Sequence, residues 1–174
     1  MRFGSVPLAE AEGRVLATHL VASLDLPPWP NSAMDGYALR LADWQGEPLP
    51  VSQRIFAGHP PQPLQPGTCA RIFTGAPLPE GADCVEMQEN TEVAEDGRVR
   101  FLEALKTGQN IRPQGQETRK GEQVMSAGTR LGPIELGLAA TLGHGRLDVV
   151  RKVRVAVLST GDELVEPGLP LGPG

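Results

Sequence analysis

At 174 residues the chain is long enough for one or two domains with a buried core. Its 16 Lys and Arg residues against 21 Asp and Glu residues give a formal net charge of -5, which argues against general binding to nucleic-acid phosphates. No stretch is apolar for long enough to form a membrane-spanning helix, and residues 1–5 do not open a secretory signal. We therefore expect a cytoplasmic protein that binds neither nucleic acid nor membrane.

Turn-forming residues are frequent: the chain has 21 glycines and 17 prolines. Because the residues between them alternate in polarity, this composition favours many turns that join short strands. We predict a mainly β fold with few helices. The two cysteines, Cys69 and Cys84, are too far apart in sequence for a CxxC motif and are expected to be reduced thiols in the core.

The first third of the chain leads to a polar turn. A helix-capable segment at residues 8–14 is weakened by Gly13, and the β-prone run 15–21 follows it. Residues 26–39 read LPPWPNSAMDGYAL, in which prolines stiffen the approach to a turn and Gly36 would permit a positive φ. A strand is expected to begin at Tyr37.

The middle of the chain contains strand and hairpin signals. Residues 50–58 and 68–75 are apolar runs that end in glycine, as is typical of strands entering turns, and residues 59–67 between them predict an irregular loop. Asp96-Gly97 separates two alternating runs and predicts a hairpin, with Val99 and Phe101 on its buried face.

The last third combines a helix with an apolar strand. Residues 132–143 predict a helix with Pro133 in its first turn and a face formed by Ile134, Leu138 and Leu142 packed on a sheet. Residues 153–158 predict a strand buried on both faces, as in a parallel sheet. Without neighbouring strands, this segment should dock on another chain or be poorly ordered.

Four stretches carry candidate chemistry. The rigid carboxylate of Asp35 could bind a metal or orient a ligand, or it could simply belong to a turn that opens a strand. Thr74-Gly75 offers a hydroxyl and backbone N–H groups to an anion, although Thr-Gly at a strand end is also an ordinary turn.

The third stretch is the polar loop at residues 107–124. Its cations Arg112, Arg119 and Lys120 lie around Gln116 and Glu117 and could meet a phosphate; the alternative is a solvated loop.

The fourth stretch follows the strand at residues 153–158. Ser159, Thr160, Asp162 and Glu163 would lie at its carboxyl end, where open α/β sheets bind ligands. One of the two carboxylates could serve Mg²⁺, while the other could cap a following helix.

Five stretches, read together, carry a family resemblance; they are NSAMDGYA (31–38), RIFTGAPLPEGAD (71–83), GQNIRPQGQE (108–117), SAGTRLGP (126–133) and VRVAVLSTGDEL (153–164). In this order and spacing they resemble the molybdopterin molybdenumtransferase family, which includes bacterial MoeA and the E domain of gephyrin. Two positions depart from the family pattern: Pro30 stands where an Asp is frequent, and Gln116-Glu117 stands where Glu-Asp is frequent.

The resemblance implies insertion of molybdate, a substrate, into adenylylated molybdopterin, with Mg²⁺ as cofactor and AMP as a product. The resemblance also implies a homodimer, with a molybdopterin adenylyltransferase as a further partner. Implied catalytic residues are Asp35, Thr74, Glu117 and Glu163; implied substrate-binding residues are Ser32, Gly75, Arg112, Ser159 and Thr160; implied metal ligands are Asp162 and Glu163.

The resemblance also implies an elongated fold of two subdomains. Residues 1–28 and 118–150 would form a discontinuous proximal subdomain, residues 29–117 a distal β-rich subdomain, and residues 151–174 the first strand and loop of a truncated α/β domain. The chain would then be a fragment of the enzyme, inactive alone. The alternative is a non-catalytic dimerisation or scaffold module of the gephyrin E type.

Overall fold

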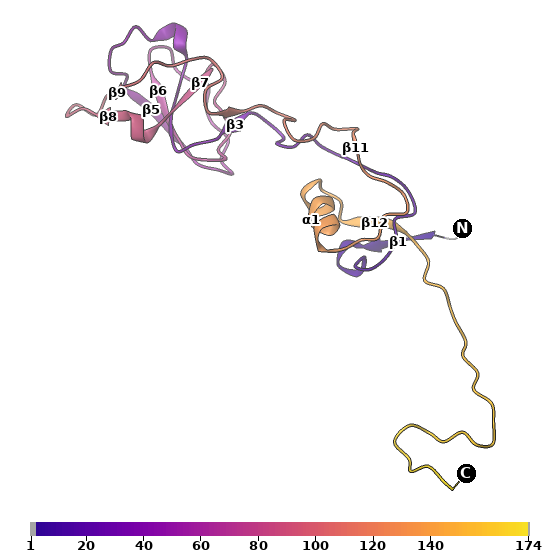
Figure 1. Cartoon of the computed structure of the whole chain (residues 1–174). Helices are drawn as coiled ribbons and strands as arrows, with labels where there is room; N and C mark the ends of the chain where they lie inside the picture. Colours follow the sequence, from indigo (N-terminus) through magenta and orange to yellow (C-terminus); the bar gives the residue numbers. More distant parts are fainter. Residues whose placement is uncertain (1–2, 174) are drawn as a thin grey trace.

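The computed structural model describes residues 3–173 of an elongated, mainly β protein (Figure 1). The described residues contain twelve short strands, three 3₁₀ helices and one α-helix. A β-rich body occupies one end and a smaller body with α1 occupies the other. Two segments of the chain, running side by side, connect the two bodies. The prediction of a mainly β fold with few helices is confirmed.

The smaller, proximal body is built from both ends of the chain. β1 (Phe3–Pro7) pairs antiparallel with β12 (Arg146–Val150), and α1 (Pro133–Thr141) lies beside this pair. Its core brings together small and aliphatic residues that are far apart in sequence: Ala11, Leu16, Leu20, Met125, Leu131, Ala139, Leu147 and Val149.

The helix α1 forms where the sequence predicts it. Pro133 occupies its first turn, the Glu135 carboxylate accepts a hydrogen bond from the Gly132 N–H at 2.9 Å, and Gly143 after its end has φ +82°. The predicted contact face is wrong in part, because Ile134 is 82% exposed. Leu138, and Leu142 just after the helix, do lie inward as predicted. They do so together with Leu136 and Ala139, which leaves Ile134 on the solvent side.

Residues 8–21 form less regular structure than predicted. The helix-capable segment yields only the 3₁₀ helix η1 (Leu8–Glu10). The predicted run of strand at residues 15–21 is reduced to β2 (Leu20–Val21), which pairs with β11 (Gln123–Met125), and to single bridges at Val15 and Leu16. The strand is interrupted because Leu16 bridges to Val149 of β12 whereas Leu20 pairs with β11.

A narrow neck joins the two bodies (Figure 1). It consists of two antiparallel chain segments, in which the Leu26 N–H donates to the Thr118 carbonyl at 2.7 Å and the Gly115 N–H donates to the Pro27 carbonyl at 2.9 Å. Where the neck meets the larger body, β3 (Asn31–Ser32) pairs with β10 (Ile111–Arg112).

The larger, distal body is organised around a four-stranded sheet. Its order is β5 (Val51–Ile55), β6 (Cys69–Ile72), β4 (Gly36–Leu39) and β7 (Cys84–Met87). The strand predicted at Tyr37 therefore begins one residue earlier. β5 and β6 are parallel, and the residues between them form the irregular loop that the sequence predicts.

The two faces of this sheet carry separate cores, because side chains alternate along each strand. One core contains Tyr37, Leu39, Leu49, Cys69, Cys84, Val99 and Phe101, and the other contains Ala38, Ile55, Leu64, Ala70, Ile72, Ala76 and Val85. The predicted hairpin, β8 (Thr91–Val93) and β9 (Val99–Phe101), covers the first core and buries Val99 and Phe101 as expected. Two further 3₁₀ helices are η2 (Leu41–Asp43) and η3 (Gln88–Asn90).

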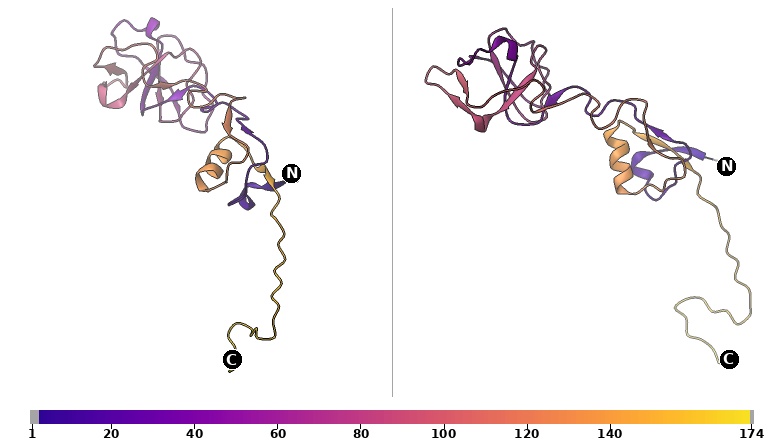
Figure 2. Two further views of the ribbon diagram at one scale, coloured as in Figure 1. Left: turned by 45° about the vertical axis from the view of Figure 1, so that its right-hand side comes forward. Right: turned by 45° about the horizontal axis from the view of Figure 1, so that its top comes forward.

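Residues 151–173 form an extended tail that leads away from β12 (Figures 1 and 2). The strand predicted at residues 153–158 is wrong for this structure: Val153, Val155, Val157 and Leu158 are each at least 77% exposed. No strand among residues 3–173 lies beside this segment to complete its backbone hydrogen bonds. Its docking on another chain stays a prediction.

Candidate functional site

The centre of the candidate site is the contact between Asp35 and Thr74. Asp35 precedes β4 and Thr74 follows β6 by two residues, and the pairing of Gly36 with Ile72 brings the two together. Asp35 Oδ1 accepts one hydrogen bond from the Thr74 backbone N–H and one from its hydroxyl, both at 2.8 Å. The two candidate stretches thus form one corner of the distal sheet.

The Asp35 carboxylate is stabilised in its charged form. The Thr74 N–H has the largest effect in lowering the pKa of Asp35, followed by the Thr74 hydroxyl; the positive charge of Arg71 adds to this, and partial desolvation opposes it. Asp35 is therefore an ionised, well-oriented acceptor at neutral pH.

Ser32 and Gly75 stabilise this corner through internal hydrogen bonds. Ser32 is fully buried, and its hydroxyl donates to the Met34 carbonyl at 2.6 Å. The Ser32 carbonyl accepts a hydrogen bond from the Gly75 N–H at 2.8 Å. The N–H groups of Thr74 and Gly75 that were expected to face an anion are thus both engaged inside the protein, and the Ser32 hydroxyl shapes the turn.

Gly36 has a different role from the one predicted. Its φ is not positive; instead, a Cβ at this position would lie 1.9 Å from the Glu86 carbonyl oxygen on β7. Only glycine permits this close approach of β4 and β7, and the approach fixes the backbone next to Asp35.

Arg112 lies on a strand next to this corner, whereas Glu117 lies in the neck. Arg112 is exposed on β10, in register with Asn31, and its neighbour Ile111 pairs with Ser32. Glu117 is exposed further along the neck, where its N–H donates to the Leu26 carbonyl at 2.9 Å. The structure therefore gathers the strands that carry Asp35, Thr74 and Arg112, whereas Glu117 belongs to the neck.

Two further residues, neither of them predicted to be a site residue, also belong to this region. Asp25 accepts hydrogen bonds from the Gln114 side chain at 2.6 Å and the Lys120 N–H at 2.8 Å, and the Lys120 N–H is the main cause of its lowered pKa. Its charge also faces Arg119, so two of the three loop cations that could bind phosphate, Arg119 and Lys120, lie beside Asp25. No local pattern reveals this brace, because its partners are 89 and 95 residues away.

The second residue is Asn31, whose side chain is 93% buried. Its Oδ1 atom accepts no hydrogen bond from any of the described residues. A buried amide oxygen without a hydrogen-bond partner is uncommon, and this one lies on the strand that pairs with the strand of Arg112.

The remaining predicted residues lie on the extended tail. Ser159, Thr160, Asp162 and Glu163 are exposed, and the tail carries them away from the body that holds Asp35 (Figure 1). Nowhere in residues 3–173 do three or more His, Cys, Asp or Glu side chains gather in a way that could hold a metal ion. Among the helices of that range, none has the length and apolar character needed to cross a membrane.

Comparison with known proteins identifies the family. The family model of the MoeA N-terminal region, domains I and II, matches residues 2–143. The chain belongs to the MoeA family.

Individual MoeA relatives match almost the whole chain. A molybdopterin molybdenumtransferase of Haemophilus influenzae is 46% identical over 169 residues, and one of Bacillus subtilis is 36% identical over 179 residues. A crystal structure of the molybdopterin biosynthesis protein MoeA of Pyrococcus horikoshii superimposes with a TM-score of 0.86 at 34% identity and covers 99% of this chain. These matches cover 42% of each of the two curated relatives and 46% of the crystallised chain, so the chain spans less than half of their length.

Proposed function

We propose that the protein containing this chain inserts molybdate into adenylylated molybdopterin and releases AMP, as a step of molybdenum cofactor biosynthesis. The observation that carries the proposal is the 46% identity, over 96% of the chain, to a relative named molybdopterin molybdenumtransferase. The proposal applies to the complete protein, and this chain alone is expected to be inactive.

In this proposal Asp35 is the central catalytic residue. Its Oδ1 atom accepts both hydrogen bonds from Thr74, which fixes the carboxylate plane, and Oδ2 would face the substrate. Thr74 acts by holding that geometry. A carboxylate kept ionised can orient a cationic or hydrogen-bonding group of a bound substrate, and preorganisation of this kind lowers the barrier to reaction.

Recognition of the anionic substrate falls to other residues of the same corner. The exposed guanidinium of Arg112 is suited to a phosphate or molybdate oxygen, because Arg presents a planar fork of donors.

The remaining predicted residues have other roles in this proposal. Glu117, in the neck, is a second acid for the same reaction. Ser32 and Gly75 maintain the loop that carries Thr74.

Mg²⁺ fits this corner only as an ion shared with the substrate. At this corner the described residues offer one fixed carboxylate, Asp35, and no closed set of protein ligands. Mg²⁺ often binds through one or two carboxylates together with water and substrate phosphates. When bound, it would neutralise charge on the phosphate linkage; Asp162 and Glu163 are the further carboxylates proposed to hold it.

The proposed assembly is a cytoplasmic homodimer, supplied with substrate by a molybdopterin adenylyltransferase. Ser159, Thr160, Asp162 and Glu163 lie on the tail, away from Asp35 of the same chain (Figure 1). If they contribute to the reaction, a second copy is the simplest source of these groups at the Asp35 corner.

A non-catalytic dimerisation or scaffold module is the second candidate function. It is favoured by the exposed apolar side chains of residues 153–158, which suit docking on another chain. The two functions differ in one measurable respect, since only the enzyme releases AMP from adenylylated molybdopterin when molybdate is added.

The test uses the full-length protein with adenylylated molybdopterin and molybdate, and measures AMP release. Asp35→Asn should lower the rate by at least about 100-fold, a loss typical of a catalytic group, while the protein remains folded. Asp96→Asn is the matched control, because Asp96 lies in the exposed hairpin turn and pairs with Arg98. Full turnover by Asp35→Asn would remove Asp35 from the mechanism, and no AMP release by the wild type would favour the scaffold module.

A further inference from the structure

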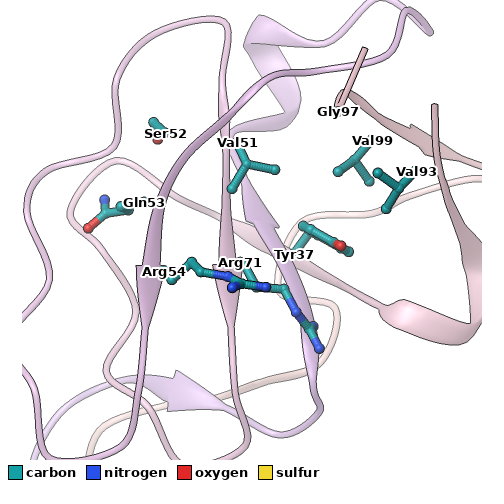
Figure 3. A pocket seen from close by; sticks show the side chains of 9 residues that line it. All are labelled: Tyr37, Val51, Ser52, Gln53, Arg54, Arg71, Val93, Gly97 and Val99. Carbon is teal, nitrogen blue, oxygen red and sulfur yellow. The ribbon is translucent and has the colours of Figure 1, made fainter. Parts of the chain in front are cut away.

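A row of polar side chains crosses the distal sheet beside a cavity (Figure 3). Arg54 of β5 is in register with Arg71 of β6, and Arg71 is in register with Tyr37 of β4. Residues in register on neighbouring strands project from the same face of a sheet. These three residues line a cavity of about 480 Å³ between the sheet and the β8–β9 hairpin.

The guanidinium of Arg71 is fixed in position. Its Nη1 donates to the Gly36 carbonyl at 2.9 Å, and its Nη2 donates to the side chain of Gln88. Its Cζ atom lies 5.1 Å from the centroid of the Tyr37 ring and 4.6 Å from that of Phe73, within the range of cation–π interactions. A guanidinium held in this way loses little conformational freedom when it binds a ligand.

Arg54 and Arg71 place two positive charges side by side without an ion-paired carboxylate. The salt bridges within residues 3–173 are Arg40 with Asp43 and Arg98 with Asp96. Like charges opposite one another on adjacent strands are destabilising. This local concentration of positive charge stands out in a chain whose net charge is -5.

Two acids near this row do not form salt bridges with the arginines. Glu86, next in the row beyond Tyr37, is fully buried and accepts hydrogen bonds from Met87, Asn90 and Gln109. Asp35 is close enough for Arg71 to affect its charge, but its hydrogen bonds come from Thr74.

The rest of the cavity wall is largely apolar. Val51 of β5, Val93 of β8 and Val99 of β9 line it together with the Tyr37 ring (Figure 3). Binding sites for small organic molecules commonly combine such walls with a few placed polar groups. The wall therefore suits a ligand in which an anionic group is attached to a compact apolar or aromatic group.

We propose that Arg54, Arg71 and Tyr37 form a binding site for a small organic anion, whose phosphate or carboxylate group lies between the two guanidinium groups. The apolar part of the ligand packs on Tyr37 and on the valines of the hairpin. This site is additional to the Asp35 corner, and its existence does not depend on the proposed reaction.

The test follows the ring resonances of Tyr37 by NMR in the 174-residue chain, in which Tyr37 is the sole tyrosine. Three ligands that share a phenyl group are compared: phenyl phosphate, benzoate and the uncharged benzyl alcohol. At least one anion should shift the Tyr37 resonances in a saturable way, and benzyl alcohol should not. The tighter of the two anions identifies phosphates or carboxylates as the natural class.

Two matched variants decide whether the arginine pair is responsible. Arg54→Gln should weaken anion binding by at least about tenfold, the loss of one charge-assisted hydrogen bond. Arg100→Gln removes the same charge from an exposed position on β9 that does not line the cavity, and should leave binding unchanged. Equal weakening by both variants, unweakened binding by Arg54→Gln, equal binding of benzyl alcohol, or no saturable shift would each overturn the proposal.

Discussion

Asp35 and Thr74, 39 residues apart in sequence, are joined by two hydrogen bonds of 2.8 Å to a single carboxylate oxygen. Because both bonds favour the ionised carboxylate, the pKa of Asp35 lies below its ordinary value of 3.8. Asp35 therefore contributes stability that is present above its unfolded-state pKa and is lost as the pH falls through the lower folded-state pKa.

Thr74→Val tests the hydroxyl contribution separately. The variant keeps the backbone N–H and removes the hydroxyl donor, so the pKa of Asp35 should rise part of the way toward its ordinary value. Carboxyl-carbon NMR titration of the folded chain between about pH 2 and 6 measures this change. Thr129→Val, in the proximal body, is the control; an Asp35 titration that is the same in both variants would contradict the assigned role of the hydroxyl.

Gly36 and Gly137 should respond in opposite directions to substitution by alanine. A Cβ on Gly36 would lie 1.9 Å from the Glu86 carbonyl, so Gly36→Ala must separate β4 from β7 and should cost about 3 kcal/mol of unfolding free energy. Gly137 is exposed within α1 and has open space around it, so Gly137→Ala should gain about 0.5–1 kcal/mol. Urea denaturation of both variants measures the two effects, and a Gly36→Ala protein of native stability would contradict the close approach.

Glu86 should stabilise the distal body through its carboxyl group. It is fully buried and accepts hydrogen bonds from the Met87 N–H and from the side chains of Asn90 and Gln109. Glu86→Ala leaves these donors unpaired and should cost about 3 kcal/mol, whereas Glu86→Gln, which retains one acceptor oxygen, should cost less. Glu89→Ala is an exposed control expected to change stability by less than about 0.5 kcal/mol; equal melting temperatures for Glu86→Ala and Glu89→Ala would refute this role.

The cysteines should be inert in the folded protein. Burial raises the pKa values of Cys69 and Cys84 to about 12 each, so neither forms the reactive thiolate near neutral pH. They lie on β6 and β7, on either side of β4, and strands two places apart are separated by about 9–10 Å, too far for a disulfide without rearrangement. Iodoacetamide should modify them only when urea unfolds the chain, and rapid modification of the native protein at pH 7.5 would contradict their burial.

The same thiols predict how stability changes in alkali. Because their folded-state pKa values lie above the unfolded-state value of 9.0, the stability they contribute is complete below pH 9 and is lost as the pH rises toward 12. A Cys69→Ser and Cys84→Ser double variant should show a smaller fall in melting temperature over this range. An identical alkaline decline in both proteins would assign it to other groups.

Local sequence patterns predicted the elements whose geometry is set within a few residues. Asp96-Gly97 defined the hairpin that buries Val99 and Phe101, and Pro133 marked the start of α1. The same patterns were less informative where a neighbouring segment decides the outcome. Ile134 matched a helical period but faces solvent, and residues 153–158 matched a buried strand but lack paired strands in the described chain.

The candidate site shows a similar division. Asp35 and Thr74 were each identifiable from turn chemistry, but their direct contact depends on the pairing of β4 with β6. The brace at Asp25 has no local signature, and the requirement for glycine at position 36 comes from the passing β7 backbone rather than from its own φ.

The amino-acid sequence by itself determined the mainly β class, the positions of the turns and the identity of the charged residues. These features depend on the polarity pattern and turn propensity of short segments. Only the tertiary structure decided which of these charges meet. The parallel pairing of β5 with β6 places Arg54 beside Arg71, and the antiparallel pairing of β6 with β4 places Thr74 on Asp35. Both contacts join residues 17 or more positions apart, whose proximity is set by strand order and register and cannot be read from either segment alone.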